Sequence, residues 1–312
     1  MEKQPKVLFV TNRDDFAVDF LIYKFKEHKI PYLRLNSEDI TNFSINYDLN
    51  DVFIHYKGNE YSFKDLNSVY FRRAPTLFPP SQDLNDIAFI NRERRDFLEG
   101  LYLTFNCKWI NPMFSTYKAE RKIYQLSMAK EIGFKVPNTI ISNNPKEILN
   151  FIKQNEKCII KPICHGLQIT KNGAYSIYTS EITDFSWLGN ESLFESPVLI
   201  QEKINKYRDI RSTVIGKQIF SVEIETDDID RIDWRKPNLK KEYKVHKLPM
   251  YIEMLMLKLH DKLNLVYSAF DFVLTPEGQY YFLETNPAGE WVWLERELNL
   301  PISNAIIQEL LT

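Results

Sequence analysis

Near its carboxyl end the 312-residue chain reads Ala269-Phe-Asp-Phe-Val-Leu-Thr-Pro-Glu-Gly-Gln-Tyr-Tyr-Phe-Leu-Glu-Thr-Asn286. From Phe270 to Leu274 every second residue is a large apolar one, which is the period of a half-buried strand. Thr275-Pro-Glu-Gly278 is a tight-turn sequence, because Pro favours the second position of such turns and Gly the fourth. Alternation resumes from Gln279 to Glu284. The stretch therefore predicts a β-hairpin.

Oxygen-bearing side chains are predicted to gather on one face of this hairpin. In a register where Asp271 faces Phe282, Glu284 is the diagonal neighbour of Asp271, roughly 7–8 Å away at the backbone. The amide oxygen of Asn286 would lie close to both carboxylates. Hard oxygen ligands of this kind suit Mg²⁺, which proteins usually share with substrate phosphates. The competing interpretation is a hairpin whose polar face is merely solvated.

Composition and charge argue against several classes of protein. A formal charge of −2 gives no reason to expect nucleic acid or an anionic membrane surface as a partner. No stretch approaches the roughly 20 apolar residues of a spanning helix, and the first residues, Met1–Lys6, lack the apolar run of a signal peptide. Cys107, Cys158 and Cys164 show neither disulfide nor metal-site spacing, which is typical of reduced thiols in a cytoplasmic protein.

The first third of the chain predicts a small parallel sheet. Val7–Val10 and Tyr32–Leu35 read as strands, and Asp14 or Asp15 can cap a helix between them. A β-α-β opening of this kind is typical of parallel strands. We expect this amino-terminal α/β domain to occupy residues 1–115.

Two α+β segments are predicted to follow. The pattern indicates a helix over residues 118–132 that ends at Gly133, and a strand over residues 157–162 that ends in a lysine. We expect a central domain at residues 116–197 and a carboxyl-terminal domain at residues 198–312, the latter holding the metal hairpin.

The usual short catalytic motifs are absent from the sequence. It contains no G-x-x-x-x-G-K-[ST], no G-x-G-x-x-G, no G-x-S-x-G and no H-E-x-x-H. If the chain binds a nucleotide, separated lysines and a metal must therefore hold the phosphates in place of a glycine loop.

Six short pieces, in order over roughly residues 115–290, resemble the ATP-grasp ligases. They are a helix with Lys122, Ile160-Lys161-Pro162, Gln201-Glu-Lys-Ile204, Asp209-Ile-Arg211, Arg235, and Asp271 with Glu284-x-Asn286. Within that superfamily the chain is most similar to the peptide-modifying ligases of microviridin-type (graspetide) biosynthesis, and Val69-Tyr-Phe-Arg-Arg-Ala-Pro75 supports this narrower match. The resemblance implies an α/β (α+β) ATP-grasp fold, with a small amino-terminal parallel-sheet domain and two α+β subdomains enclosing ATP and Mg²⁺.

The resemblance also implies a role for each matching residue. Lys122 and Lys161 would contact ATP phosphates, and Asp209 would reach the ribose hydroxyls. Arg211 and Arg235 would act in catalysis, by stabilising charge on the transferred phosphoryl group and on the activated carboxylate. The adenine contacts would be Gln201, Glu202, Lys203 and the backbone of Ile204. The magnesium ligands would be Asp271, Glu284 and Asn286.

Several of these residues also have a simpler interpretation when taken alone. Lys122 reads as a surface helix lysine, Arg235 as part of a solvated loop, and Glu202-Lys203 as a polar strand end. Lys161 is different, because a lysine at a buried strand end needs an anionic partner.

One stretch departs from the family pattern. ATP-grasp ligases cover the phosphates with a glycine-rich loop, whereas residues 165–173 contain only Gly166 and Gly173, and the whole chain has 9 glycines. We therefore expect a stiffer or differently shaped loop. His165 suggests an acid or a base, but the pattern favours an ordinary loop residue or a phosphate contact.

The sequence leaves three functions to be distinguished. The first is a ligase that joins Asp or Glu side chains of a ribosomally made precursor peptide to Thr, Ser or Lys side chains of the same peptide, through ester or amide links. The resemblance then implies leader recognition near residues 184–197 and a possible homodimer. The second is an ATP-dependent ligase that adds a free amino acid to a protein or small-molecule carboxylate. The third is a non-catalytic nucleotide-binding module, which the presence of every lysine and metal-ligand candidate disfavours.

Overall fold

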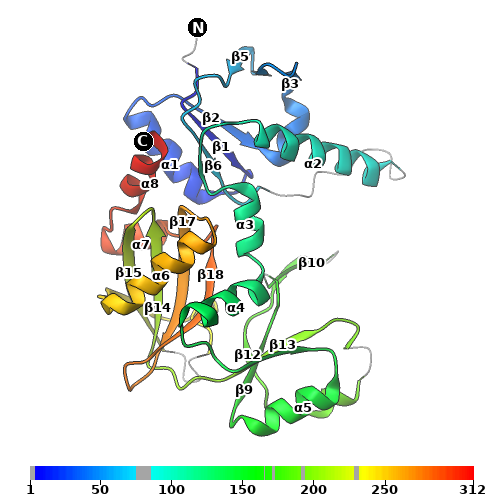
Figure 1. Cartoon of the computed structure of the whole chain (residues 1–312), viewed down its shortest axis with the longest axis vertical. Coiled ribbons are helices and arrows are strands. Elements are labelled where there is room, and N and C mark those ends of the chain that lie inside the picture. Colours follow the sequence, from blue (N-terminus) through cyan, green and yellow to red (C-terminus); the bar gives the residue numbers. More distant parts are fainter. Residues whose placement is uncertain (1–3, 75–85, 165, 171–172, 191–193, 228–231) are drawn as a thin grey trace. The chain divides into compact units, whose positions relative to one another are not determined.

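The computed structural model describes residues 4–74, 86–164, 166–170, 173–190, 194–227 and 232–312 (Figure 1). The chain forms two compact units. The first consists of Met1–Thr116, Asn264–Tyr267 and Ala288–Thr312, and the second of Tyr117–Leu263 and Ser268–Pro287.

A four-stranded parallel sheet forms the centre of the first unit and confirms the predicted one. Its order is β2-β1-β6-β7, and all three pairings are parallel. Strand β1 is buried at every position, as expected where helices cover both faces. The elements of this unit are β1 (Val7–Thr11), α1 (Phe16–Glu27), β2 (Tyr32–Asn36), η1 (Ser37–Asn42), β3 (Ser44–Tyr47), β4 (Val52–Tyr56), β5 (Asn59–Ser62), β6 (Ser68–Phe71), α2 (Ile87–Leu103), β7 (Lys108–Ile110), α7 (Val292–Leu298) and α8 (Ile302–Leu311).

Local signals explain the ends of several elements. The side chain of Asp15 accepts hydrogen bonds from the amides of Ala17 and Val18, which makes Asp15 the cap of α1. Gly133 ends α4 (Lys122–Ile132) with φ of 108°, a left-handed conformation that glycine adopts without strain. Both ends agree with the sequence pattern.

The second unit contains two larger antiparallel sheets. One has the order β12-β9-β13-β8, and the other has the order β16-β15-β14-β17-β18. The elements of this unit besides α4 are β8 (Thr139–Ser142), α5 (Pro145–Gln154), β9 (Cys158–Lys161), β10 (Leu167–Thr170), β11 (Gly173–Ser176), β12 (Ser180–Glu181), η2 (Ser186–Gly189), β13 (Val198–Glu202), β14 (Arg208–Ile215), β15 (Gln218–Thr226), β16 (Lys241–Val245), α6 (Met250–Lys262), β17 (Tyr267–Leu274) and β18 (Tyr280–Asn286).

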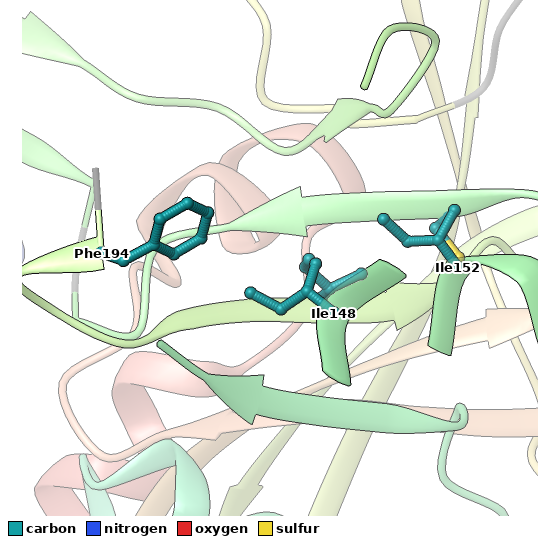
Figure 2. Close-up of a cluster of buried hydrophobic side chains, with 5 residues drawn as sticks. Ile148, Ile152 and Phe194 are labelled. Atoms are coloured by element: carbon teal, nitrogen blue, oxygen red, sulfur yellow. The ribbon is translucent and has the colours of Figure 1, made fainter. Parts of the chain in front are cut away.

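A small apolar cluster holds α5 against the four-stranded sheet. Ile148 and Ile152 lie one helical turn apart on α5 and point toward the sheet, and Phe194 lies beside them (Figure 2). Cys158 and Ile200 complete the cluster from β9 and β13. This packing fixes the strand that ends in Lys161.

Aromatic rings form the core under the five-stranded sheet. Phe270, Phe272 and Phe282 are fully buried, and Phe134 stacks on Phe282 with ring centroids 5.2 Å apart. Strand β17 is buried at every position except Asp271, which is half-buried, so both of its faces are covered, in contrast to the half-buried strand that the sequence predicts.

Two local predictions need correction. The helix predicted over residues 118–132 is two helices, α3 (Met113–Ala119) and α4, because Arg121 is extended between them. Within residues 165–173, predicted only as a polar loop, Leu167–Thr170 form strand β10, which pairs antiparallel with β11.

The domain boundaries can be compared with the two units. The first unit ends at Thr116, next to the expected boundary at residue 115, but residues 288–312 also belong to it. The division of the remaining chain at residues 197 and 198 stays a prediction. Within the described part of the chain, no helix combines the length and apolar character needed to cross a membrane.

Candidate active site

The two carboxylates of the hairpin face each other directly. Asp271 on β17 is the register partner of Glu284 on β18. The predicted register, in which Asp271 faces Phe282 and Glu284 is its diagonal neighbour, is therefore wrong. The true pairing brings the two side chains closer than predicted, because directly opposed residues have Cβ atoms about 4.5–5.5 Å apart.

Two irregularities account for the shifted register. The turn closes through bonds from the Thr275 amide to the Gln279 carbonyl and from the Gly278 amide to the Thr275 carbonyl, so Leu274 pairs with Tyr280. A β-bulge then leaves Leu283 as an extra residue in β18, because Phe272 pairs with Phe282 while Asp271 pairs with Glu284. Each irregularity moves the pairing by one residue.

Asp271 has a buried cationic partner. The guanidinium of Arg211, on the neighbouring strand β14, donates to Asp271 Oδ2 at 2.7 Å. Burial raises the pKa of Asp271, and the Arg211 charge opposes that shift. A second carboxylate, Glu284, raises the pKa of Asp271 further. A divalent cation between the carboxylates would relieve their repulsion.

Glu284 faces cations from outside the hairpin. Lys122 Nζ lies 3.4 Å from Glu284 Oε2, and Arg235 Nη1 lies 3.9 Å from Glu284 Oε1. Burial by itself would raise the pKa of Glu284, but the charges of Lys122, Lys161 and Arg235 together hold it below the usual value. Glu284 is therefore an anion in a cationic surrounding.

Lys161, at the end of β9, is a cation whose pKa burial strongly lowers. Burial lowers the pKa of Lys161 to about 8, and the charge of Glu284 partly opposes this shift. Lys122 and Arg235 lower the pKa further, because they are like charges. A polyphosphate placed among these groups would raise the pKa of Lys161 again and favour its charged form.

Lys122 and Arg235 are both held in place by neighbours. Lys122 Nζ donates to the carbonyl of Pro162 at 2.9 Å, just beyond β9. Arg235 Nε and Nη2 donate to the two oxygens of Asp233 at 2.9 and 2.8 Å. Such a bidentate pair fixes the plane of a guanidinium that is otherwise half exposed.

Gln201 presents an acceptor that suits a nucleobase amine. Its side chain is fully buried and donates to Thr139 Oγ1 at 2.8 Å. Its Oε1 atom is buried without a hydrogen-bond partner among the residues that the structure describes. An amino group such as that of adenine would satisfy this orphaned oxygen.

The other residues expected to contact adenine interact with the protein itself. Glu202 accepts from the amide of Asn138 at 3.1 Å and from its side chain at 2.8 Å. Lys203 forms an ion pair with Glu181, and Ile204 follows as a partly buried residue just beyond β13.

Asp209 lies on β14 two residues before Arg211 and is held by a neighbouring lysine. Lys206 Nζ lies 2.8 Å from Asp209 Oδ2, and both side chains are buried. Burial raises the pKa of Asp209 to about 6, against the effect of the Lys206 charge. Its expected contact with ribose hydroxyls stays a prediction.

The charges around the hairpin suit a magnesium–polyphosphate complex. Four cations face three carboxylates, which leaves a net charge of +1 in the absence of any ligand. The cations are Lys122, Lys161, Arg211 and Arg235, and the carboxylates are Asp233, Asp271 and Glu284.

Among the described residues no group of three or more His, Cys, Asp and Glu side chains could hold a metal. The donor set here is instead two carboxylates and the amide of Asn286 at the end of β18, which suits Mg²⁺ shared with phosphate oxygens.

Solved structures match almost the whole chain. The macrocyclase MdnC of Microcystis aeruginosa, solved with its precursor peptide MdnA, is 28% identical, with a TM-score of 0.86 over 97% of this chain and 98% of MdnC. The RiPP-associated ATP-grasp ligase of Chryseobacterium gregarium, solved with ADP and a leader and core peptide, is 25% identical, with a TM-score of 0.86 over 98% of this chain and 96% of that ligase. The chain is an ATP-grasp ligase.

A more distant relative agrees with this assignment. Tetrahydromethanopterin:alpha-L-glutamate ligase of Methanocaldococcus jannaschii is 23% identical over 217 residues, which are 67% of this ligase and 72% of the relative. No family model matches the chain.

Several residues that hold the ligase site together were not found from sequence. Asp233 is the partner of Arg235 and stands two residues before it, so the Asp-x-Arg spacing was a usable signal. Lys206 and Asn138 gave no such signal, because a single lysine or asparagine in a loop is common. His165 and Pro75, both considered at the level of sequence, lie outside the described residues, as do residues 191–193 of the expected leader-binding region.

Proposed function

We propose that this ligase joins carboxylate side chains of a peptide to hydroxyl or amine side chains of the same peptide, at the expense of ATP. The observation that carries the proposal is the full-length match to MdnC and to the Chryseobacterium gregarium ligase, which includes the amino-terminal unit. The glutamate ligase matches over only 67% of this chain. MdnC is a macrocyclase solved with a precursor peptide, and we extend that substrate class to this chain.

The chemistry follows from the weakness of carboxylates as acylating agents. A substrate carboxylate oxygen attacks the γ-phosphorus of ATP, the bond to the β-phosphate oxygen breaks, and ADP leaves. A hydroxyl or amine of the peptide then attacks the acylphosphate carbon, loses its proton, and expels phosphate. Negative charge concentrates in both steps, so positioned cations contribute more than a protein nucleophile would.

The residues of the ligase would divide this work. Lys122 and Lys161 would bind phosphate oxygens, and the buried acceptor of Gln201 would select the adenine amine. Arg211 and Arg235 would stabilise charge on the phosphoryl group in transfer and on the activated carboxylate. Both guanidiniums are oriented by carboxylates, Asp271 and Asp233 respectively, so little reorganisation is needed.

The oxygen donors of the hairpin would hold magnesium. Asp271, Glu284 and Asn286 fit this ion because all three offer hard oxygen ligands and the two carboxylates are paired in register. When bound, magnesium supplies positive charge that neutralises the phosphate oxygens.

Other features of the proposal come from the resemblance. The precursor peptide would carry a leader, bound near residues 184–197, and an acidic core that supplies the reacting carboxylates. We also expect a homodimer and a cytoplasmic location. Neither nucleic acid nor a membrane is expected as a partner.

A mass measurement tests the proposed reaction. The ligase is incubated with ATP, Mg²⁺ and a short acidic peptide encoded beside its gene, and we expect the peptide to lose one water for each new link. The variant Glu284→Gln should leave the peptide mass unchanged, whereas Glu277→Gln, in the exposed turn of the same hairpin, should react normally. An unmodified peptide with the unaltered enzyme contradicts the proposal.

A second candidate function is favoured by the glutamate ligase and by the alpha-aminoadipate–LysW ligase LysX of Sulfurisphaera tokodaii, 25% identical over 222 residues. Their names describe the ligation of alpha-L-glutamate to tetrahydromethanopterin and of alpha-aminoadipate to LysW. If this ligase adds an amino acid to a carboxylate, the peptide gains the mass of that amino acid less one water. Supplying glutamate in the same incubation distinguishes the two reactions.

A further inference from the structure

A buried glutamine on helix α4 binds the backbone between the two metal-ligand candidates of β18. Gln125 Oε1 accepts the amide proton of Thr285 at 2.7 Å. Gln125 Nε2 donates to the Thr285 carbonyl at 3.2 Å and to the Ala119 carbonyl at 2.9 Å. Both the oxygen and the amino group of the side chain are thus used.

The position of Thr285 makes this contact informative. Thr285 stands between Glu284 and Asn286, and β18 is the outermost strand of its sheet. An outermost strand leaves one row of backbone groups without a neighbouring strand. The amide of Gln125 supplies one donor and one acceptor to that row, as a neighbouring strand would, and both Gln125 and Thr285 are only 2% exposed.

Helix α4 also carries a cation of the site. Lys122 lies three residues before Gln125, so both side chains project from the same face of the helix. Lys122 reaches Glu284 at 3.4 Å, while Gln125 holds the next residue of β18. Because α4 packs along β18 (Figure 1), the glutamine fixes the helix and the strand in one relative position.

We propose that Gln125 is a positioning residue, which holds Glu284 and Asn286 in the geometry that binds the divalent cation and keeps Lys122 at its distance from Glu284. This inference rests on the proposed function, since it assigns the cation to those two residues. Residues that orient metal ligands without touching the metal typically change metal affinity by about 10- to 100-fold when altered.

The test measures metal binding without any peptide or turnover. The full-length protein is titrated with Mn²⁺ in the presence of ADP, and free Mn²⁺ is followed by electron paramagnetic resonance. Gln125→Met keeps a similar volume but removes all three hydrogen bonds. We expect its apparent dissociation constant for Mn²⁺ to rise by about 10- to 100-fold, with the native circular dichroism spectrum retained.

A matched variant separates positioning from a general loss of stability. Ser268→Ala removes another buried hydrogen bond of the same sheet, in which Ser268 Oγ lies 2.7 Å from His260 Nδ1. That bond is directed to helix α6 and away from the metal-ligand candidates. Ser268→Ala should therefore reduce the urea midpoint without weakening Mn²⁺ binding.

The outcomes distinguish this inference from the proposed function. If the unaltered protein does not bind Mn²⁺, the assigned metal site itself fails. If the unaltered protein binds and Gln125→Met binds equally well, or if Ser268→Ala weakens binding to the same extent, the positioning role is overturned. Should Gln125→Met not fold, Gln125→Asn keeps the amide but shortens its reach by one methylene, and unchanged Mn²⁺ affinity in that variant also overturns the inference.

Discussion

Arg211 and Asp271 form a buried ion pair across neighbouring strands, with Arg211 Nη1 2.7 Å from Asp271 Oδ2. The pair lies beside Glu284, the register partner of Asp271. The Asp271 carboxylate is thus compensated before any ligand binds. Because each charge is desolvated, the pair is expected to behave as a unit.

Removing only one member of this pair should be more damaging than removing both. Arg211→Met leaves the Asp271 charge buried without its partner, and we expect the free energy of unfolding to fall by about 3–5 kcal/mol. The double variant Arg211→Met with Asp271→Asn has no lone charge and should regain most of that stability while remaining inactive. Urea unfolding and a turnover assay measure the two effects.

An ion pair on the same strand with one exposed partner serves as the control. Arg208 Nη2 lies 2.9 Å from Glu225 Oε2, and the side chains of Arg208 and Glu225 are 14% and 40% exposed. Arg208→Met should therefore cost less than about 1 kcal/mol. Equal losses for Arg208→Met and Arg211→Met, or a double variant no more stable than the single one, would contradict the buried-pair argument.

Nucleotide affinity should decrease above about pH 8. Lys161 binds phosphate as the protonated form, and burial has lowered its pKa from 10.5 to about 8 in the ligand-free protein. We expect affinity for a non-hydrolysable ATP analogue to be nearly constant below that pH and to fall by up to about tenfold per pH unit above it. Fluorescence titration between about pH 7 and about pH 9.5 measures this dependence.

The stability of the nucleotide-free protein should respond in the opposite direction. Burying charged Lys161 costs free energy below about pH 8, and that cost is relieved as the pH rises toward the unperturbed value of 10.5. Lys161→Met should abolish both this pH-dependent contribution to stability and the steep loss of nucleotide affinity. Lys262→Met, which breaks an exposed pair with Glu131, should change neither. A persistent affinity loss in Lys161→Met would assign the titration to another group.

The burial of Asp209 predicts an acid-side effect on stability. Burial raises the pKa of Asp209 from 3.8 to about 6, so its charged form destabilises the fold above pH 6. As the pH falls toward 3.8, protonation relieves that cost. Relative to Asp209→Asn, the unaltered protein should gain up to about 3 kcal/mol between about pH 7 and about pH 4. Urea unfolding at several pH values tests this, and parallel curves for the two proteins would refute it.

Local pattern was sufficient to predict much of the fold. The turn predicted at Thr275–Gly278 closes the hairpin where expected, because glycine permits the positive φ of 78° that Gly278 adopts. The parallel sheet of the first unit also follows from short apolar runs separated by a capped helix. Signals of this kind act over a few residues and need no tertiary contact.

The types of the residues and their order along the chain were sufficient to propose the site residues. They were not sufficient to predict which residues of the hairpin face each other. Phe282 is held inward by stacking on Phe134 and by a bond from its amide to the Lys135 carbonyl at 2.8 Å. Leu283 becomes the extra residue of the bulge next to this anchored position. The periodicity of residues 269–286 contains no information about their contacts with Phe134 and Lys135, which lie about half the chain away.

Amino-acid type and spacing alone thus specified a hairpin of oxygen donors, because this is a property of a short segment. The resemblance to ATP-grasp ligases added the two separated lysines and the two arginines. The folded chain specified which charges neutralise one another: Arg211 with Asp271, Arg235 with Asp233, and Lys122 with Glu284. It also placed Gln125 against Thr285, 160 positions along the chain. Ion pairing and hydrogen bonding depend on distances of a few ångströms, and these distances arise only when remote segments pack around a common core.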